Sequence, residues 1–161
     1  MKKFIMLFVF LFLLISTYSL KPIFYEISKI NNVIFGESLY CYYCLGVNEN
    51  ISSYAEIIDN GNSYIVKTTI NNKRIVKENI SEILGESIKI KTPKTTILKI
   101  INYYNINEVK EENVGDIYSF YGYSKNIFQN YVFIDEKPVN IQLAYSDGYL
   151  TIGNPIILGE Y

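Results

Sequence analysis

The sequence has 161 residues, contains neither His nor Trp, and carries a formal net charge of −1 at neutral pH. Without histidine the chain lacks the commonest general base and the commonest metal ligand, which excludes Ser-His and Cys-His nucleophiles. A mildly acidic chain also disfavours nucleic-acid binding, which needs clustered Lys and Arg, so we predict a protein that is not an enzyme and has no cofactor and no nucleic-acid partner.

The N-terminus has the layout of an export signal. Lys2 and Lys3 precede an uninterrupted apolar run over 4–15, and polar residues return from Ser16 onward. A basic start, an apolar run of this length and small residues near Ser19 are typical of a secretory signal peptide. The run is shorter than the roughly 20 apolar residues of a spanning helix. Ser and Thr make a poor cleavage site, however, so an uncleaved anchor remains an alternative.

Two segments follow from this layout. We predict that 1–19 is a signal peptide or N-terminal anchor and that 20–161 is a single domain, since about 140 residues suffice for one hydrophobic core. The domain is expected to be secreted or anchored to the outer face of the cytoplasmic membrane. Membrane contact would occur only through an uncleaved N-terminal segment, and the expected partner is an envelope protein or a cell-wall component.

The first half of the domain is predicted to begin with a helix and three strands. Apolar residues at i, i+4, i+7 and i+11 predict a helix over 22–34. The Tyr- and Cys-rich stretch 38–45 predicts a strand. Residues 54–58 and 63–70 predict a hairpin around the turn-forming residues 59–62.

A helix is predicted next, with Asn71 or Asn72 as its cap and Gly85 just past its end. Its apolar face would contain Ile75, Val76, Ile80, Ile83 and Leu84. Residues 87–91 alternate briefly and predict a short strand.

A second helix is predicted from Thr92 and Pro93, which suit an N-cap and a first helical position, to Asn105, which can end it. Its inward side chains would be Ile97, Leu98, Ile100, Ile101 and Tyr104.

The last third is predicted to be mostly sheet. Residues 114–123 form an aromatic-rich strand, 124–132 a short helix, and 139–145 an alternating strand. An Asp-Gly turn at 147–148 then leads into a strand over 149–158. The fold class is therefore α+β, with a mostly antiparallel sheet and helices on one face.

The motif Val-Asn-Ile-Gln-Leu-Ala over 139–144, the stretch Thr-Ile-Gly-Asn-Pro-Ile-Ile over 151–157 and the final Glu-Tyr pair occur together at the C-terminus. This segment resembles the end of the YwmB family, exported proteins of spore-forming Firmicutes. The resemblance extends through 117–131 and, more loosely, back to Pro22. Asn154 stands where the family usually has Thr, and the early part of the domain is shortened.

The resemblance implies a curved sheet similar to that of the TATA-box-binding protein, and a link to sporulation. No catalytic residues are established for the family, so none is carried over. The fold does not confer DNA binding. A minor-groove saddle needs basic side chains and apolar wedges, whereas removal of Lys2 and Lys3 with the leader leaves this chain at a net charge of −3.

Cys41 and Cys44 form the only redox-like pattern. In an extended strand, residues three apart lie roughly 10 Å from each other and point to opposite faces, which is too far for a disulfide. We therefore expect two buried thiols. A local turn would instead allow a thiol oxidoreductase, and two Cys without His make a zinc site less plausible still.

Tyr118, Tyr121 and Tyr123 are the candidate binding residues. Aromatic side chains on a strand usually serve the core, but a Tyr row that faces outward could stack on a carbohydrate or a peptide.

Two further patterns have structural interpretations. Glu108, Glu111, Glu112 and Asp116 predict a solvated acidic loop rather than a Ca²⁺ site, because no Asp-x-Asp-x-Asp-Gly loop is present. The stretch 153–155 predicts an edge strand or a bulge, because proline cannot donate to a ladder.

The first functional hypothesis is an exported, non-enzymatic binding module at the cell envelope. It predicts an exposed aromatic patch or groove on the uncovered face of the sheet. The alternatives are a nucleic-acid-binding protein, which requires a basic concave sheet, and a thiol oxidoreductase that uses Cys41 and Cys44.

Overall fold

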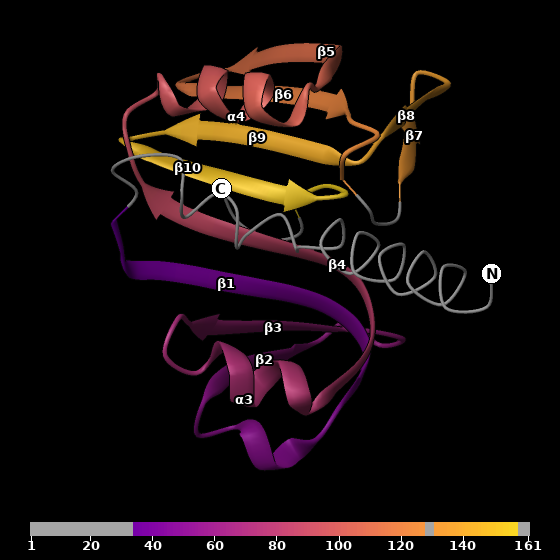
Figure 1. Cartoon of the computed structure of the whole chain (residues 1–161). Coiled ribbons are helices and arrows are strands. Elements are labelled where there is room, and N and C mark those ends of the chain that lie inside the picture. The colour runs from indigo at the N-terminus through magenta and orange to yellow at the C-terminus, as the bar shows by residue number, and fades with distance from the viewer. Residues whose placement is uncertain (1–33, 128–130, 158–161) are drawn as a thin grey trace, which may run out of the picture.

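The described part of the chain forms one antiparallel sheet. The computed structural model describes residues 34–127 and 131–157, with strands in the order β2-β3-β1-β4-β10-β9-β6-β5 and a separate β7–β8 hairpin (Figure 1). The strands are β1 (Ile34–Val47), β2 (Ala55–Asp59), β3 (Tyr64–Thr69), β4 (Ile80–Lys91), β5 (Asn107–Val114), β6 (Ile117–Tyr123), β7 (Val132–Ile134), β8 (Lys137–Val139), β9 (Ile141–Ser146) and β10 (Tyr149–Asn154). The helices are η1 (Glu49–Ile51), α3 (Lys73–Glu78) and α4 (Thr96–Tyr104). The predicted α+β class with a mostly antiparallel sheet is confirmed.

Two halves of the chain meet at the centre of the sheet. Strands β1 to β4 build one side, and β5, β6, β9 and β10 build the other. The two sides join where β4 pairs with β10, with Ile88 opposite Ile152. Ile88 also lies opposite Tyr40 of β1, so these three buried side chains share one face of the sheet.

That face carries the hydrophobic core. Alternate side chains of the central strands point into it because residues two apart on a strand share a face. The core includes Tyr40, Tyr42, Ile88, Ile90, Phe120, Ile141, Leu143, Leu150 and Ile152, all at most 3% exposed. Val76 of α3 and Ile97, Ile100 and Tyr104 of α4 belong to the same cluster, and Figure 1 shows both helices on one side of the sheet.

Both hairpins that turn residues predict, at 59–62 and at 147–148, are present. Strands β2 and β3 are joined by a turn in which Asp59 Oδ1 accepts from the Gly61 N–H at 2.8 Å. Strands β9 and β10 are joined by Asp147 and Gly148, both with positive φ (52° and 81°), as a two-residue turn of this type requires.

The helix predicted to run toward Gly85 is wrong beyond its first turns. Helix α3 ends at Glu78, and Asn79 caps it by donating from its side chain to the Ile75 carbonyl at 2.9 Å. Ile80 and Ile83 instead belong to β4, where they pair with Val47 and Cys44 of β1. Pairing with β1 therefore decides the structure of these residues, although their apolar spacing is helical. The short strand predicted over 87–91 is the C-terminal part of β4.

Helix α4 is confirmed, with one side chain misplaced. It begins at Thr96, after Thr95 as N-cap, rather than at the predicted Pro93, and Asn105 ends it in the left-handed conformation (φ 50°). Ile97 and Ile100 point inward as predicted. Leu98 does not, because it is 64% exposed.

The acidic stretch predicted as a loop is the edge strand β5. It pairs antiparallel with β6 over Asn107 to Val114. Charged residues on both faces hide the strand pattern from the sequence, and such charges are what protects an edge strand from pairing with another chain.

The helix predicted over 124–132 is absent from its described parts, 124–127 and 131–132. A turn held by the buried Asn140 takes its place. The Asn140 side chain accepts from the Ser124 N–H at 2.9 Å and donates to the carbonyls of Ser124 and Ile127 at 2.8 and 3.2 Å. Val132 then enters the unpredicted hairpin β7–β8.

Two predictions fall largely on residues outside the described ranges. The helix over 22–33 and the leader over 1–19 lie outside them, while Ile34, the last residue of the predicted helical stripe, belongs to β1. Among the described residues, no helix is long and apolar enough to cross a membrane.

Candidate binding face

The face of the sheet opposite the core is the candidate site, and no helix among the described residues packs on it (Figure 1). We call it the open face. By strand register it contains Leu39, Cys41, Tyr43 and Leu45 of β1, Ile65 and Lys67 of β3, Ser87, Lys89 and Lys91 of β4, Tyr149 and Thr151 of β10, Gln142, Ala144 and Ser146 of β9, and Ile117, Ser119, Tyr121 and Tyr123 of β6.

The centre of the open face is a floor of small side chains. Ser119, Ala144 and Thr151 lie side by side across three strands and are at most 6% exposed. Lys89 continues this row on β4. The floor itself is therefore almost inaccessible to solvent.

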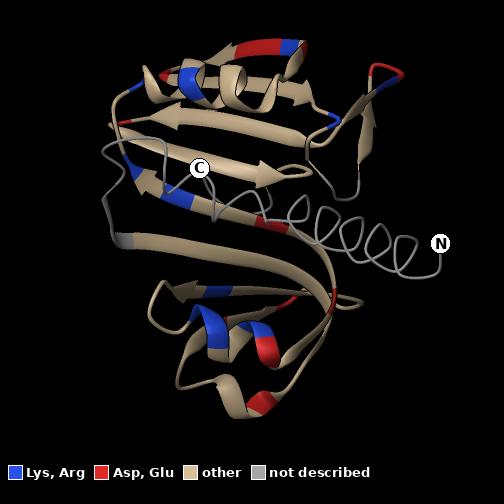
Figure 2. Cartoon of the chain, viewed as in Figure 1, with Lys and Arg blue, Asp and Glu red and all other residues tan. Residues whose placement is uncertain are grey.

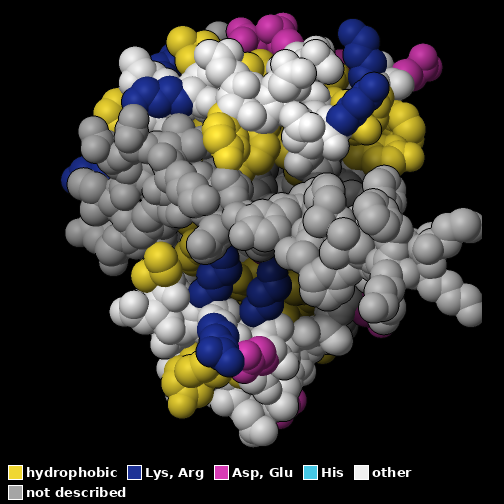
Figure 3. Space-filling view, in the orientation of Figure 1, with side chains coloured by type: hydrophobic (Ala, Val, Ile, Leu, Met, Phe, Trp, Pro, Cys, Tyr) yellow, Lys and Arg dark blue, Asp and Glu magenta, His cyan; other side chains and the backbone are white. Residues whose placement is uncertain are grey.

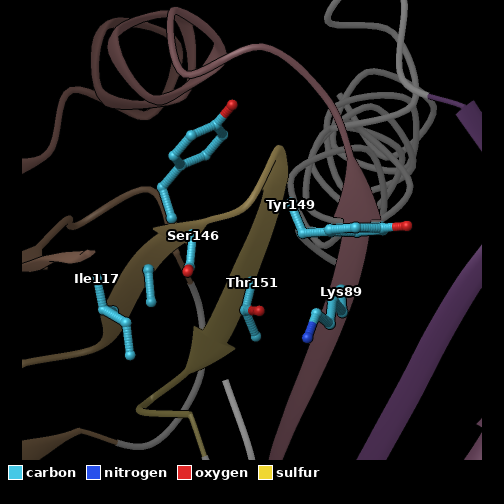
Figure 4. A pocket seen from close by; sticks show the side chains of 7 residues that line it. Lys89, Ile117, Ser146, Tyr149 and Thr151 are labelled. Carbon is cyan, nitrogen blue, oxygen red and sulfur yellow. The ribbon is translucent and has the colours of Figure 1, made fainter. Parts of the chain in front are cut away.

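A shallow hollow of about 10 Å³, room for one water molecule, lies over one end of this floor (Figure 4). Tyr149 and Lys89 stand on one side of it and Ile117 and Ser146 on the other, with Thr151 between them. The Lys89 ammonium lies 5.6 Å from the centroid of the Tyr149 ring. The hollow therefore combines a cation, an aromatic ring and hydroxyl groups.

The other end of the floor is closed by the chain itself. After Asn154 the backbone folds back over Gly153, where a Cβ atom would lie 2.3 Å from the Ile157 nitrogen. The Ile157 N–H donates to Gln142 Oε1 at 2.9 Å. The edge or bulge predicted at 153–155 is wrong, because β10 is a central strand; glycine is required here for close backbone approach.

Strand β1 adds an exposed apolar stripe to the open face. Leu39 and Leu45 are each 42% exposed, and the half-buried Tyr43 lies between them. Half-buried Ile65 lies opposite Tyr43 on β3. The sequence contains a signal for this stripe, because its residues alternate with core residues over 38–45. The sequence does not show, however, which of the two faces of the strand the helices cover.

The structure separates the three candidate tyrosines. Tyr121 and Tyr123 lie on the open face and are half-buried. Tyr118 lies on the helix side, where its hydroxyl donates to Glu111 Oε1 at 2.8 Å and the Lys94 ammonium lies 4.4 Å from its ring centroid. Burial, followed by the Glu111 carboxylate, raises the pKa of Tyr118 to about 12. Sequence reasoning singled out none of Leu39, Lys89 and Tyr149.

Cys41 and Cys44 are both thiols on an extended strand. Cys41 lies on the open face opposite Lys67, whereas Cys44 is buried on the core side and its Sγ lies 3.9 Å from the Tyr64 carbonyl. Burial raises the pKa of both thiols, which disfavours the thiolate that redox chemistry requires.

A second cluster of charge lies on the helix side. Lys73, Arg74 and Lys77 of α3 line an open pocket together with Glu78 (Figure 3). Arg74 Nε pairs with Glu78 at 2.9 Å, and Lys77 Nζ lies 3.8 Å from the buried Glu86. The cluster therefore consists largely of internal ion pairs.

The predicted acidic cluster is not gathered into a cation site. Glu108, Glu111 and Glu112 are spread along β5, where Glu112 accepts from the Lys110 ammonium at 2.6 Å. Within the described residues no three carboxylates or thiols are placed to hold a metal ion.

Comparison with known proteins adds no relative: no family model, no curated protein and no solved structure matches this chain.

Proposed function

We propose that this chain is an exported, non-enzymatic interaction module that binds a protein partner at the cell envelope through its open face. The observation that carries the proposal is the exposure of Leu39 and Leu45 on a sheet face that no helix of the described residues covers. Exposing two leucines on one strand costs solvation free energy, and such stripes mark sites of contact with other proteins.

The composition of the face favours a protein over a glycan. Leucine and isoleucine gain free energy by burial against apolar side chains, whereas sugars are held mainly by stacking on aromatic rings. The aromatic side chains of the open face, Tyr43, Tyr121, Tyr123 and Tyr149, combine an apolar ring with a polar end, which suits a protein interface.

Export and the finer fold are part of this proposal. The basic and apolar residues over 2–15 support export. The resemblance of the C-terminal segment to the YwmB family supports an envelope location, an association with sporulation and a sheet similar to that of the TATA-box-binding protein. An antiparallel sheet with its helices on one face is compatible with that architecture.

The test is to select peptides that bind the chain and to measure how substitutions on the open face weaken their binding. The full-length chain is used to select peptides from a displayed random 12-residue library, and the dissociation constants of the selected peptides are then measured. Leu39→Asp should weaken their binding about tenfold or more, because a charge replaces one of the two exposed leucines of the stripe.

Leu98→Asp is the matched control. Leu98 is even more exposed, at 64%, but it lies on α4 on the other side of the sheet. Its replacement should leave binding unchanged. Enrichment of no peptide, or equal loss with both variants, would refute an open-face interaction module.

A further inference from the structure

The charge of the open face differs in sign from that of the chain as a whole. The chain is net negative, with 16 acidic and 15 basic residues. Figure 2 shows its acidic residues mainly at the rims, on β5, the β7–β8 turn, η1 and α3, while β4 carries two basic segments near its end. These two segments are Lys89 and Lys91, both on the open face.

The two lysines have no ion pair among the described residues. Carboxylates accompany the chain's other open-face lysines: Glu56 lies opposite Lys67 across β2 and β3, and Glu112 pairs with Lys110 on β5. Around Lys89 and Lys91 the facing open-face side chains are Leu39, Tyr149 and Thr151, which are all uncharged.

Glu37 of β1 lies in the sequence between Ile34 and Leu39, which pair with Lys91 and Lys89; the other acidic residues near this part of β4 lie elsewhere. Glu86 points into the core face, and Glu82 lies seven residues before Lys89 on β4, about 20 Å away along an extended strand. Asp147 lies in the β9–β10 turn, where its carboxylate accepts from the Ser146 hydroxyl at 3.3 Å. Because neither lysine has an ion pair among the described residues, both ammonium groups can meet an anionic partner.

The spacing of the lysines indicates the form of that partner. Residues two apart on a strand are separated by roughly 7 Å. The same distance separates residues i and i+2 of any extended peptide, so two carboxylates at these positions can meet both lysines at once. Beyond Lys89 the open face of β4 continues with Ser87 and Gly85, beside Cys41 and Tyr43 of β1. Ser87 and Gly85 are themselves buried, so the accessible apolar side chains along this part of the face are those of Leu39 and Tyr43 on β1.

We propose that the open face binds an extended acidic segment of its protein partner, with carboxylates at i and i+2 on Lys91 and Lys89 and apolar side chains at i+4 and i+6 next to the apolar side chains of β1. This inference rests on the proposed interaction function and specifies the chemistry of the partner. The charges set the register, and burial beside Leu39 and Tyr43 supplies most of the affinity.

The test uses two labelled synthetic peptides, measured by fluorescence anisotropy with the full-length chain. One has Glu at i and i+2 and Leu at i+4 and i+6, with Thr between them; the other has Lys in place of both Glu. The Glu peptide should bind at least about tenfold more tightly than the Lys peptide, and added salt should reduce this difference.

Charge reversal provides the decisive arm. In Lys89→Glu/Lys91→Glu the preference should switch to the Lys peptide, while the control Lys99→Glu, on the exposed side of α4, should keep the wild-type preference. Equal binding of both peptides with loss in Leu39→Asp would overturn the acidic segment but leave open-face docking intact. Failure of both peptides and of the selected library would refute the proposed function as well. Tighter binding of duplex DNA than of the Glu peptide would assign the lysines to nucleic acid and overturn the inference.

Discussion

Tyr40 is a single buried side chain whose ionisation makes the stability of the fold depend on pH. It is 3% exposed, and the Lys73 ammonium lies 4.2 Å from its ring centroid. Burial, and after it the carboxylate of Glu86, raises the pKa of Tyr40 to about 12. The folded chain therefore holds the phenolic proton at pH values where the unfolded chain has released it.

We predict that Tyr40→Phe makes the free energy of unfolding less sensitive to alkaline pH. A raised pKa gives stability that is complete below pH 10 and is lost as the pH rises toward 12. Between pH 9 and 11 the wild type should lose about 1 kcal/mol more than the variant, as measured by urea unfolding. Tyr54→Phe, at an exposed tyrosine, is the control. Identical losses in wild type and Tyr40→Phe would contradict the assignment.

At the scale of elements, the end of helix α4 depends on one residue. Asn105 has φ 50°, and its N–H donates to the Asn102 carbonyl at 3.3 Å while the Ile106 N–H donates to the Ile101 carbonyl at 3.0 Å. The left-handed residue turns the chain from α4 into the edge strand β5. Asparagine and glycine adopt this conformation with little strain, and other residues do not.

We predict that Asn105→Ala lowers the free energy of unfolding by about 1 kcal/mol, and that Asn105→Gly leaves it nearly unchanged. The measurement is chemical denaturation of both variants. Asn102→Ala is the control inside the helix and should raise stability by about 0.5 kcal/mol, because alanine is the better helix former. A similar loss for alanine and glycine at position 105 would show that the backbone conformation is not the cause.

The elements that the sequence predicts correctly are those with strong local signals. Turn residues locate both the β2–β3 and the β9–β10 hairpins, and Asn105 marks the end of α4. The predictions are wrong where contacts with residues distant in the sequence determine the local structure. Residues 80–84 have helical spacing but pair with β1, and 124–127 form a turn because Asn140, from another part of the chain, satisfies their backbone groups.

The candidate site was less predictable than the fold, for a physical reason. The sequence shows which residues alternate on a strand but not which of the two faces the helices cover. Tyr121 and Tyr123 share the open face with Leu39 and Lys89, yet 82 residues separate Leu39 from Tyr121, and only the sheet order β1-β4-β10-β9-β6 places them on one surface. Tyr118 was grouped with them by proximity in sequence, although one position along a strand reverses the face.

At the scale of the whole molecule, basic and acidic side chains occupy different parts of the surface. The open-face lysines that have no carboxylate directly opposite them lie at the end of β4, while acidic residues occupy the edge strand β5 and several turns. Such a distribution favours one orientation of an anionic partner and disfavours pairing between copies of the chain at β5.

The last prediction concerns the route by which the chain reaches its partner. A fusion of the full chain to a phosphatase that folds only outside the cytoplasm should be active, and removal of residues 2–19 should abolish that activity. The physical reason is that the apolar run over 4–15, preceded by Lys2 and Lys3, partitions into the membrane with its basic end retained inside.

Leu11→Arg, which places a single charge within the apolar run, should also reduce export. Lys125→Glu, an exposed charge change in the domain, should leave it unaltered. Full phosphatase activity without residues 2–19 would show that another part of the chain directs export. An inactive fusion of the full chain would remove the envelope from the proposed function, but it would leave the proposed binding of an acidic segment by Lys89 and Lys91 untouched.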